Sequence, residues 1–169
     1  KLEDKAFLSV KLYAQTENYQ SAVVSGRSFI EEYPQSKNRE EVAFIMLQNG
    51  YILATKSVFS KKKARLEEVL SVYENYKSDL EKRRYQDRAL AYYKNTMSLL
   101  EEVDERVAYN EILSSYASSQ SLSTKKKMDF LAETKERYHK FAQKYPESEL
   151  LKKAQDTFNK ADKELINLK

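Results

Sequence analysis

Apolar residues recur at helical spacing from the first residues of the chain onward. Residues 2–16 carry them three and four positions apart and predict a first helix, and residues 19–33 repeat the period and predict a second. Pro34 ends the second helix, because the residue before a proline is pushed out of the helical region. Ser36 or Asn38 can then cap the next helix. The pattern therefore opens with a helical hairpin.

The same period continues to the end of the chain and predicts about eight helices. The third is apolar around most of its circumference, as expected of a helix covered on both sides, and we expect Gly50 within it to mark a close helix crossing. This third helix is expected over residues 38–58, the fourth over 61–80, the fifth from about 82 and the sixth over 104–119. The apolar stripes of the seventh and eighth span residues 128–145 and 151–168. No Gly or Pro lies between Tyr51 and Tyr145, so the fifth and sixth could form one rod, although the repeat described next favours a break.

An internal repeat links the two halves of the chain. Displacing the sequence by 65 residues places six packing residues of the third helix on similar residues of the sixth. The first set is Val42, Ala43, Phe44, Leu47, Tyr51 and Ala54, and the second is Val107, Ala108, Tyr109, Ile112, Tyr116 and Ser119. Further on, Tyr73 falls on Tyr138 and Tyr93 on Phe158. Because the repeat preserves packing positions, it indicates an array of supersecondary units.

We therefore predict an all-α fold of tetratricopeptide-like antiparallel helical repeats that forms a right-handed superhelix. It would be a single domain over residues 1–169, with units of about 1–36, 37–103 and 104–169. Two Gly and two Pro in 169 residues leave little turn chemistry for strands. The absence of Cys excludes disulfides and thiolate sites, and the longest apolar run is far shorter than the ~20 residues of a membrane span.

Candidate chemistry is sparse, and we predict a protein that is not an enzyme and has no cofactor, no metal and no small-molecule substrate. His139 is the only histidine, and no Cys or second His can join it in a metal or catalytic site. Acidic doublets could in principle supply paired carboxylates, but adjacent helical residues point about 100° apart and suit a charged surface better. They are Glu31-Glu32, Glu40-Glu41, Glu67-Glu68 and Glu101-Glu102.

Three basic runs each stand at a predicted helix start. They are residues 61–63, 82–84 and 125–127, and acidic residues follow within a turn or two. A net charge of +4 and the lack of a recognised motif argue against nucleic-acid binding. We favour a solvated surface, with contact to an anionic lipid or an acidic partner as the alternative.

The hairpin spacing resembles tetratricopeptide repeats, and residues 18–54 together with SKKKARLEEVLSVYENY resemble a narrower family. At tetratricopeptide spacing stand Tyr13, Asn18, Tyr19, Ala22 and Pro34. The Tyr-Pro-x-Ser turn, the Arg-Glu-Glu helix start, the Lys-rich break and the Tyr-studded helix are similar to the C-terminal half of the BamD-type outer-membrane assembly lipoproteins of Bacteroidetes. Residues 120–165 resemble that ending a second time.

The resemblance implies a non-enzymatic scaffold on the periplasmic face of the outer membrane, with β-barrel assembly factors or unfolded outer-membrane protein segments as partners. Its membrane tether would be a lipidated Cys upstream of Lys1, where we also expect the family's N-terminal repeats, because the chain opens within a helical pattern. Membrane contact is thus expected only from outside this chain. The alternative is a general peptide-binding adaptor, with a cytoplasmic location also open.

A partner-binding groove is expected on the inner helices of the array. Positions next to the core sites are Phe7, Lys11, Gln15, Asn49, Ile52 and Leu53. Exposed aromatic and aliphatic side chains there would suit an extended or helical peptide. Replacing Phe7 and Ile52 with charged residues is then expected to abolish binding while helicity is retained.

Overall fold

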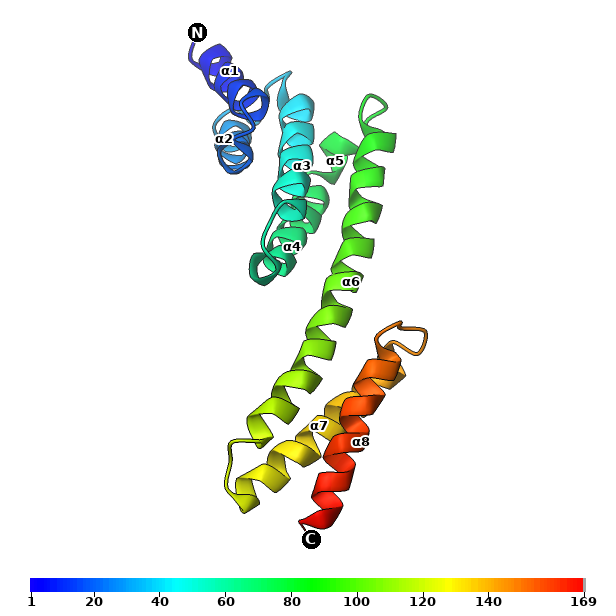
Figure 1. Cartoon of the computed structure of the whole chain (residues 1–169). Helices are drawn as coiled ribbons and strands as arrows, with labels where there is room; N and C mark the ends of the chain where they lie inside the picture. Colours follow the sequence, from blue (N-terminus) through cyan, green and yellow to red (C-terminus); the bar gives the residue numbers. More distant parts are fainter. Residues whose placement is uncertain (169) are drawn as a thin grey trace. The chain divides into compact units, whose positions relative to one another are not determined.

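The computed structural model describes residues 1–168, and within them the chain is all-α with eight helices and no strand (Figure 1). This confirms the predicted fold class, whereas the right-handed superhelix stays a prediction. In chain order the helices are α1 (Leu2–Gln15), α2 (Tyr19–Glu32), α3 (Arg39–Thr55), α4 (Phe59–Asn75), α5 (Lys77–Leu80), α6 (Gln86–Ser119), α7 (Thr124–Lys144) and α8 (Leu151–Asn167).

Two of the predicted helices differ from those observed. The helix expected over residues 61–80 is interrupted at Tyr76, whose carbonyl accepts the amides of both Asp79 and Leu80. The interruption brings Asp79 to α3, where its carboxylate accepts a 2.8 Å hydrogen bond from Nε of Arg39. A buried charged contact between distant residues thus outweighs local helix propensity.

The predicted break between the fifth and sixth helices is wrong, because α6 runs without interruption over 34 residues. No Gly or Pro stands within it, and Val103 in the middle of the expected break is buried. With neither a helix-breaking residue nor a cap, an apolar side chain that packs keeps the helix continuous.

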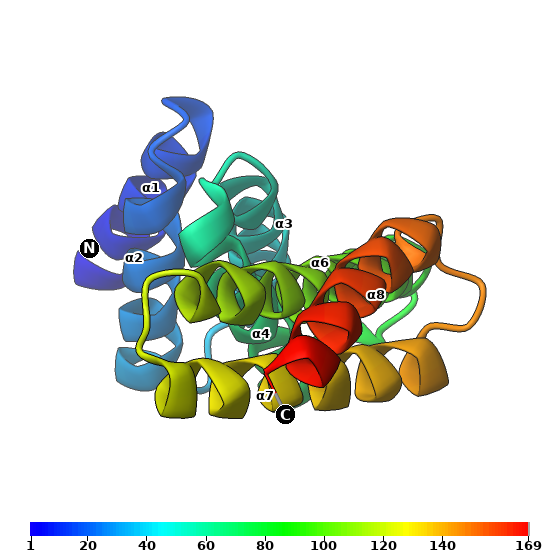
Figure 2. The same cartoon turned by 60° about the horizontal axis from the view of Figure 1, so that its bottom comes forward.

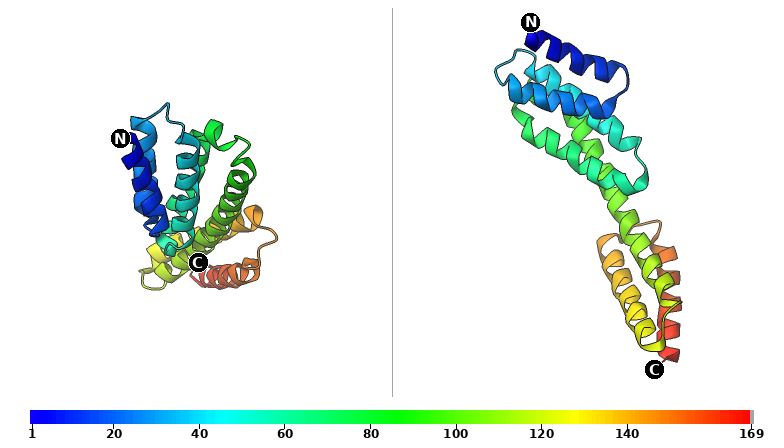
Figure 3. Two further views of the ribbon diagram at one scale, coloured as in Figure 1. Left: turned by 90° about the horizontal axis from the view of Figure 1, so that it is seen from above. Right: turned by 90° about the vertical axis from the view of Figure 1, so that its left-hand side faces the viewer.

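The chain divides into two compact units, residues 1–101 and 102–169, and whether they fold as the single domain predicted is not tested by this division. The first unit is built on α3, which packs against α2 on one side and α4 on the other, as its all-round apolar sequence predicts (Figure 3). Its fully buried side chains include Val10, Val42, Met46, Leu47 and Leu66.

In the second unit α7 and α8 form an antiparallel pair, and the short turn over residues 120–123 joins α7 to the second half of α6 (Figure 2). Two apolar clusters fill this unit. One gathers Ile112, Phe141, Tyr145 and Ala154, and the other gathers Leu131, Ala161 and Leu165.

The internal sequence repeat is accompanied by a repeat of contacts between aromatic side chains. The rings of Tyr73 and Tyr93 lie 4.4 Å apart at 31°, and those of their counterparts Tyr138 and Phe158 lie 4.7 Å apart at 33°. The aromatic contact at the turn after α2 also recurs at the turn after α7. Phe29 and Tyr33 have centroids 5.3 Å apart at 46°, and Phe141 and Tyr145 have centroids 5.3 Å apart at 47°. Sequence positions matched on packing therefore occupy matching places in the fold.

The closest helix approach in the first unit lies at Gly26 of α2, and the expectation for Gly50 was wrong. A Cβ on Gly26 would stand 2.4 Å from Cγ of Met46, a fully buried side chain, and 3.3 Å from Val42. A Cβ on Gly50 would meet Val69 at 3.5 Å and Val23 at 3.8 Å, which are ordinary contacts. Only Gly26 is required by the crossing of α2 and α3.

The two glycines give a matched pair of variants with opposite expected effects. Gly26→Ala should lower the free energy of unfolding by about 1–3 kcal/mol, because it overpacks the α2–α3 contact. Gly50→Ala should raise it by about 0.5–1 kcal/mol, because alanine restricts the unfolded chain and fits the space. Urea denaturation of both variants followed by circular dichroism measures the difference, and equal stabilities would contradict this account.

Candidate binding surface

A chain of charged side chains crosses the face shared by α1, α3 and the start of α6. Nζ of Lys11 on α1 lies 3.3 Å from Oε1 of Glu41 on α3, and Nη2 of Arg84, just before α6, lies 3.7 Å from the other oxygen of Glu41. The Arg84 side chain is 68% exposed and the Glu41 side chain 26%. One partly buried carboxylate is thus shared by two more exposed cations.

Each ring of an aromatic stack next to this chain of charges contacts one arginine. The rings of Phe44 and Tyr85 stack at 4.6 Å and 15°. The guanidinium of Arg88 lies 4.4 Å from the centroid of Phe44, and that of Arg84 lies 5.0 Å from the centroid of Tyr85. Both rings are buried, whereas both arginines are exposed. Cation–π contact therefore holds two guanidinium groups at fixed places on the surface.

We refer to Lys11, Glu41, Arg84 and Arg88 as the cationic row. It carries three positive charges and one negative charge. Of the other acidic groups nearby, Glu40 lies 2.8 Å from Nζ of Lys82 and Asp79 binds Arg39, whereas Asp87 stands between Arg84 and Arg88 in the first turn of α6. A shallow hollow on α6 adjoins the row and is lined by Arg88, Ala91, Tyr92 and Asn95.

The structure places the six predicted groove residues on two helices, α1 and α3, and buries them to different degrees. Lys11 and Phe7 lie together, with the Lys11 ammonium 5.2 Å from the ring centroid, and Gln15 is exposed on the same helix. Ile52 and Leu53 are half-buried on α3. Asn49 is only 3% exposed and its side-chain amide donates to the carbonyl of Ile45, so its assignment to an open groove is corrected. Binding by the remaining five stays a prediction.

Phe7 is also a core contact, because its ring lies 6.0 Å from that of buried Phe29. A charged residue at this position would disturb packing as well as any surface, so the substitution proposed from the sequence does not isolate binding. Sequence reasoning placed Arg84 in the basic run 82–84 but missed Arg88 and the contacts of both arginines with the aromatic stack of Tyr85. The signal available was their spacing, which puts two arginines on either side of an aromatic residue at the start of a helix.

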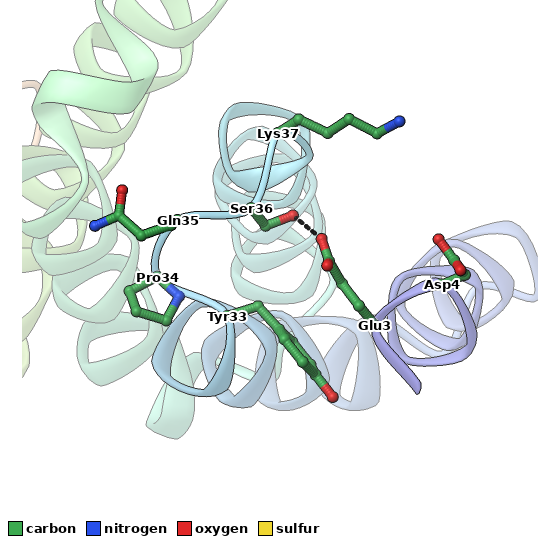
Figure 4. A pocket seen from close by; sticks show the side chains of 7 residues that line it. All are labelled: Glu3, Asp4, Tyr33, Pro34, Gln35, Ser36 and Lys37. Atoms are coloured by element: carbon green, nitrogen blue, oxygen red, sulfur yellow. Dashed lines mark hydrogen bonds between the residues drawn. The ribbon is translucent and has the colours of Figure 1, made fainter. Parts of the chain in front are cut away.

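A second candidate is the hollow at the Tyr-Pro-x-Ser turn, which is lined by Glu3 of α1 as well as by the turn itself (Figure 4). The Ser36 hydroxyl donates to Oε1 of Glu3 at 2.6 Å and accepts the amide of Asn38 at 3.1 Å. In the second unit Ser148 bonds Glu105 in the same way and accepts the amide of Leu150. Because the polar groups satisfy one another in both copies, the arrangement serves the turn.

A third candidate is the polar cluster around Glu164 on α8. Its carboxylate accepts hydrogen bonds from the Tyr116 hydroxyl at 2.5 Å and from the Gln120 amide, and Nζ of Lys127 lies 2.9 Å away. The hydrogen bond to Glu164 and burial raise the pKa of Tyr116 to about 12, and the bond from Tyr116 lowers the pKa of Glu164. Both pKa values thus move away from neutrality, opposite to what acid–base catalysis at neutral pH requires.

The other residues considered for chemistry lie on the surface. His139 is exposed, with its ring 5.1 Å from that of Phe158. Within residues 1–168 no group of three His, Cys, Asp or Glu side chains is placed to hold a metal ion. Among the same residues, no helix combines the length and apolar character that crossing a membrane requires.

Comparison with models of known protein families finds none that matches the chain, and comparison with curated proteins finds no significant match.

The Glu164 cluster makes a prediction about pH. Because the pKa of Glu164 is lower in the folded than in the unfolded chain, its stabilising effect is present above the usual glutamate pKa of about 4.3 and is lost as the pH falls through the folded value. Glu164→Gln should therefore lower the free energy of unfolding by about 1–2 kcal/mol at neutral pH. The difference in free energy of unfolding between this variant and wild type should decrease at acid pH.

Urea denaturation across the acid range measures that difference. Glu136→Gln is the matched control, since Glu136 is exposed and pairs only with Lys140 on its own helix. It should change stability little. A deficit for Glu164→Gln that is the same in acid as at neutral pH would contradict the assignment.

Proposed function

We propose that this chain is a non-enzymatic protein-binding scaffold whose partner docks on the cationic row and the adjoining hollow of α6. The observation that carries the proposal is the aromatic stack with the guanidinium of an exposed arginine against each ring. Long arginine side chains on a free surface lose conformational entropy when they bind, whereas these two are already held in place by cation–π contact. Preorganisation of this kind favours recognition of a partner.

The chemistry of the row favours a partner segment that is rich in carboxylates. A guanidinium presents paired N–H donors that match a carboxylate, and Arg84 has only a long 3.7 Å contact to Glu41. A partner carboxylate could bind Arg84 or Arg88 without displacing a strong ion pair. The half-buried Tyr92, whose hydroxyl accepts a 3.0 Å hydrogen bond from Gln48, adds aromatic surface beside them.

The biological setting we propose is the outer-membrane β-barrel assembly machinery, at the periplasmic face of the outer membrane. Support comes from the sequence resemblance over residues 18–54 and 120–165, and the helical-repeat architecture is compatible with it. The alternative is a peptide-binding adaptor outside that machinery. A lipidation signal in the sequence upstream of Lys1 would support the assembly role. Capture of the full-length protein together with the barrel-inserting outer-membrane protein would discriminate this role from that of a general adaptor.

Charge reversal of the row tests where the partner binds. Arg84→Glu together with Arg88→Glu should reduce capture of the partner by at least tenfold, because two attractive contacts become repulsive. Lys152→Glu together with Lys153→Glu, two exposed residues of α8, makes the same change in net charge elsewhere and should leave capture unchanged.

Quantitative mass spectrometry of the captured proteins, with circular dichroism to confirm helicity, provides the measurement. Equal losses in the two variants would mean that net charge alone attracts the partner. Undiminished capture by the Arg84/Arg88 variant would remove this face from the binding site.

A further inference from the structure

The turn between α3 and α4 presents an apolar tip to solvent. Val58 is 65% exposed and Phe59 is 41% exposed, and the two are adjacent in sequence where α4 begins. The turn closes the α3–α4 hairpin at the end opposite to the α2–α3 turn, so the pair stands at the end of a helical layer of the first unit (Figure 1). The two side chains thus leave a large part of their apolar surface in contact with water.

Lysines follow this tip directly. Lys61, Lys62 and Lys63 occupy the first turn and a half of α4, and among the described residues neither Lys61 nor Lys62 has a carboxylate partner. Positive charge in the first turn of a helix opposes the helix dipole, and α4 has no acidic residue there. Helix stability therefore does not account for the lysines at this position.

In the second copy of the repeat, the lysine run occurs without the exposed apolar pair. At the α6–α7 turn the lysine run recurs as residues 125–127, and Lys125 and Lys126 are exposed. Ser123, which precedes α7, and Thr124, its first residue, stand where Val58 and Phe59 stand at the start of α4, so both matching positions are polar. The first turn thus combines an exposed apolar pair with Lys61 and Lys62, whereas the second has its lysines without such a pair.

We propose that the α3–α4 turn docks the protein on a membrane surface that contains anionic lipids, with Val58 and Phe59 entering the interface and Lys61 and Lys62 contacting headgroups. A protruding apolar tip requires a pocket in a protein partner, but a lipid interface accepts it without one. Aromatic and aliphatic side chains flanked by lysines are the composition that such interfaces bind. This contact goes beyond the protein-binding function proposed above and departs from our expectation that membrane contact comes only from outside this chain.

Tryptophan fluorescence gives a direct readout, because the sequence contains no Trp. Phe59→Trp places a single tryptophan in the tip, and Thr124→Trp places one at the matching first position of α7. With the full chain and vesicles of equal parts phosphatidylcholine and phosphatidylglycerol, the emission of Phe59→Trp should shift to the blue and that of Thr124→Trp should not. Vesicles of phosphatidylcholine alone should shift neither.

Vesicle cosedimentation then assigns the contributions. Val58→Ser with Phe59→Ser should abolish binding to the mixed vesicles, and Lys61→Gln with Lys62→Gln should weaken it roughly 25-fold, since each lysine near an anionic surface contributes roughly fivefold in affinity. The control, Lys125→Gln with Lys126→Gln, should bind as wild type does. Circular dichroism confirms that each variant is folded.

The outcomes discriminate this proposal from simple attraction and from a protein ligand. Loss of binding in the control as large as in the Lys61/Lys62 variant, or full binding by the Val58/Phe59 variant, would show charge attraction without insertion and overturn the proposal. Failure of wild type to bind mixed vesicles would also overturn it and would leave an acidic protein surface as the ligand of these lysines.

Discussion

The burial of α3 on two sides is the constraint on which the first unit depends. Because α2 covers one side and α4 the other, the helix must be apolar around most of its circumference, and its neighbours must approach closely. Gly26 permits that approach, since any larger residue would collide with Met46 in the core. The same burial limits where α3 can carry polar groups. Glu41 and Gln48 lie on its remaining stripe, and both contact partners outside the α2–α4 layer.

The cationic row follows from that limited stripe. Glu41 is partly buried against α1 and the segment before α6, so its charge must be matched, and Lys11 and Arg84 reach it from either side. The two arginines are then fixed by rings that belong to the core, because Phe44 and Tyr85 stack inside while their outer faces remain accessible to guanidinium groups. Core packing therefore determines the geometry of the surface on which we base the proposed function.

Much of the fold could be predicted from the sequence because the signals are local. Apolar period, the two prolines and the packing repeat gave the class and the bounds of most helices to within a few residues. The errors arose where individual side-chain contacts decide. Asp79 interrupts a helix to reach Arg39, Val103 keeps α6 continuous by burial, and Asn49 satisfies its amide within its own helix instead of facing a groove. The arginine–aromatic stack brings α3 to the start of α6, so no pattern within one segment reveals it.

The most direct test of the central claim is site-specific photo-crosslinking of the full-length protein in intact cells. A photoreactive phenylalanine analogue replaces Asn95 in the hollow on α6, and a second version carries it at Gln155, an exposed position on α8. The account predicts that the Asn95 position crosslinks to one defined partner, through a segment rich in Asp and Glu, and that the Gln155 position does not. Crosslinking of the same partner from Gln155 with none from Asn95 would contradict it.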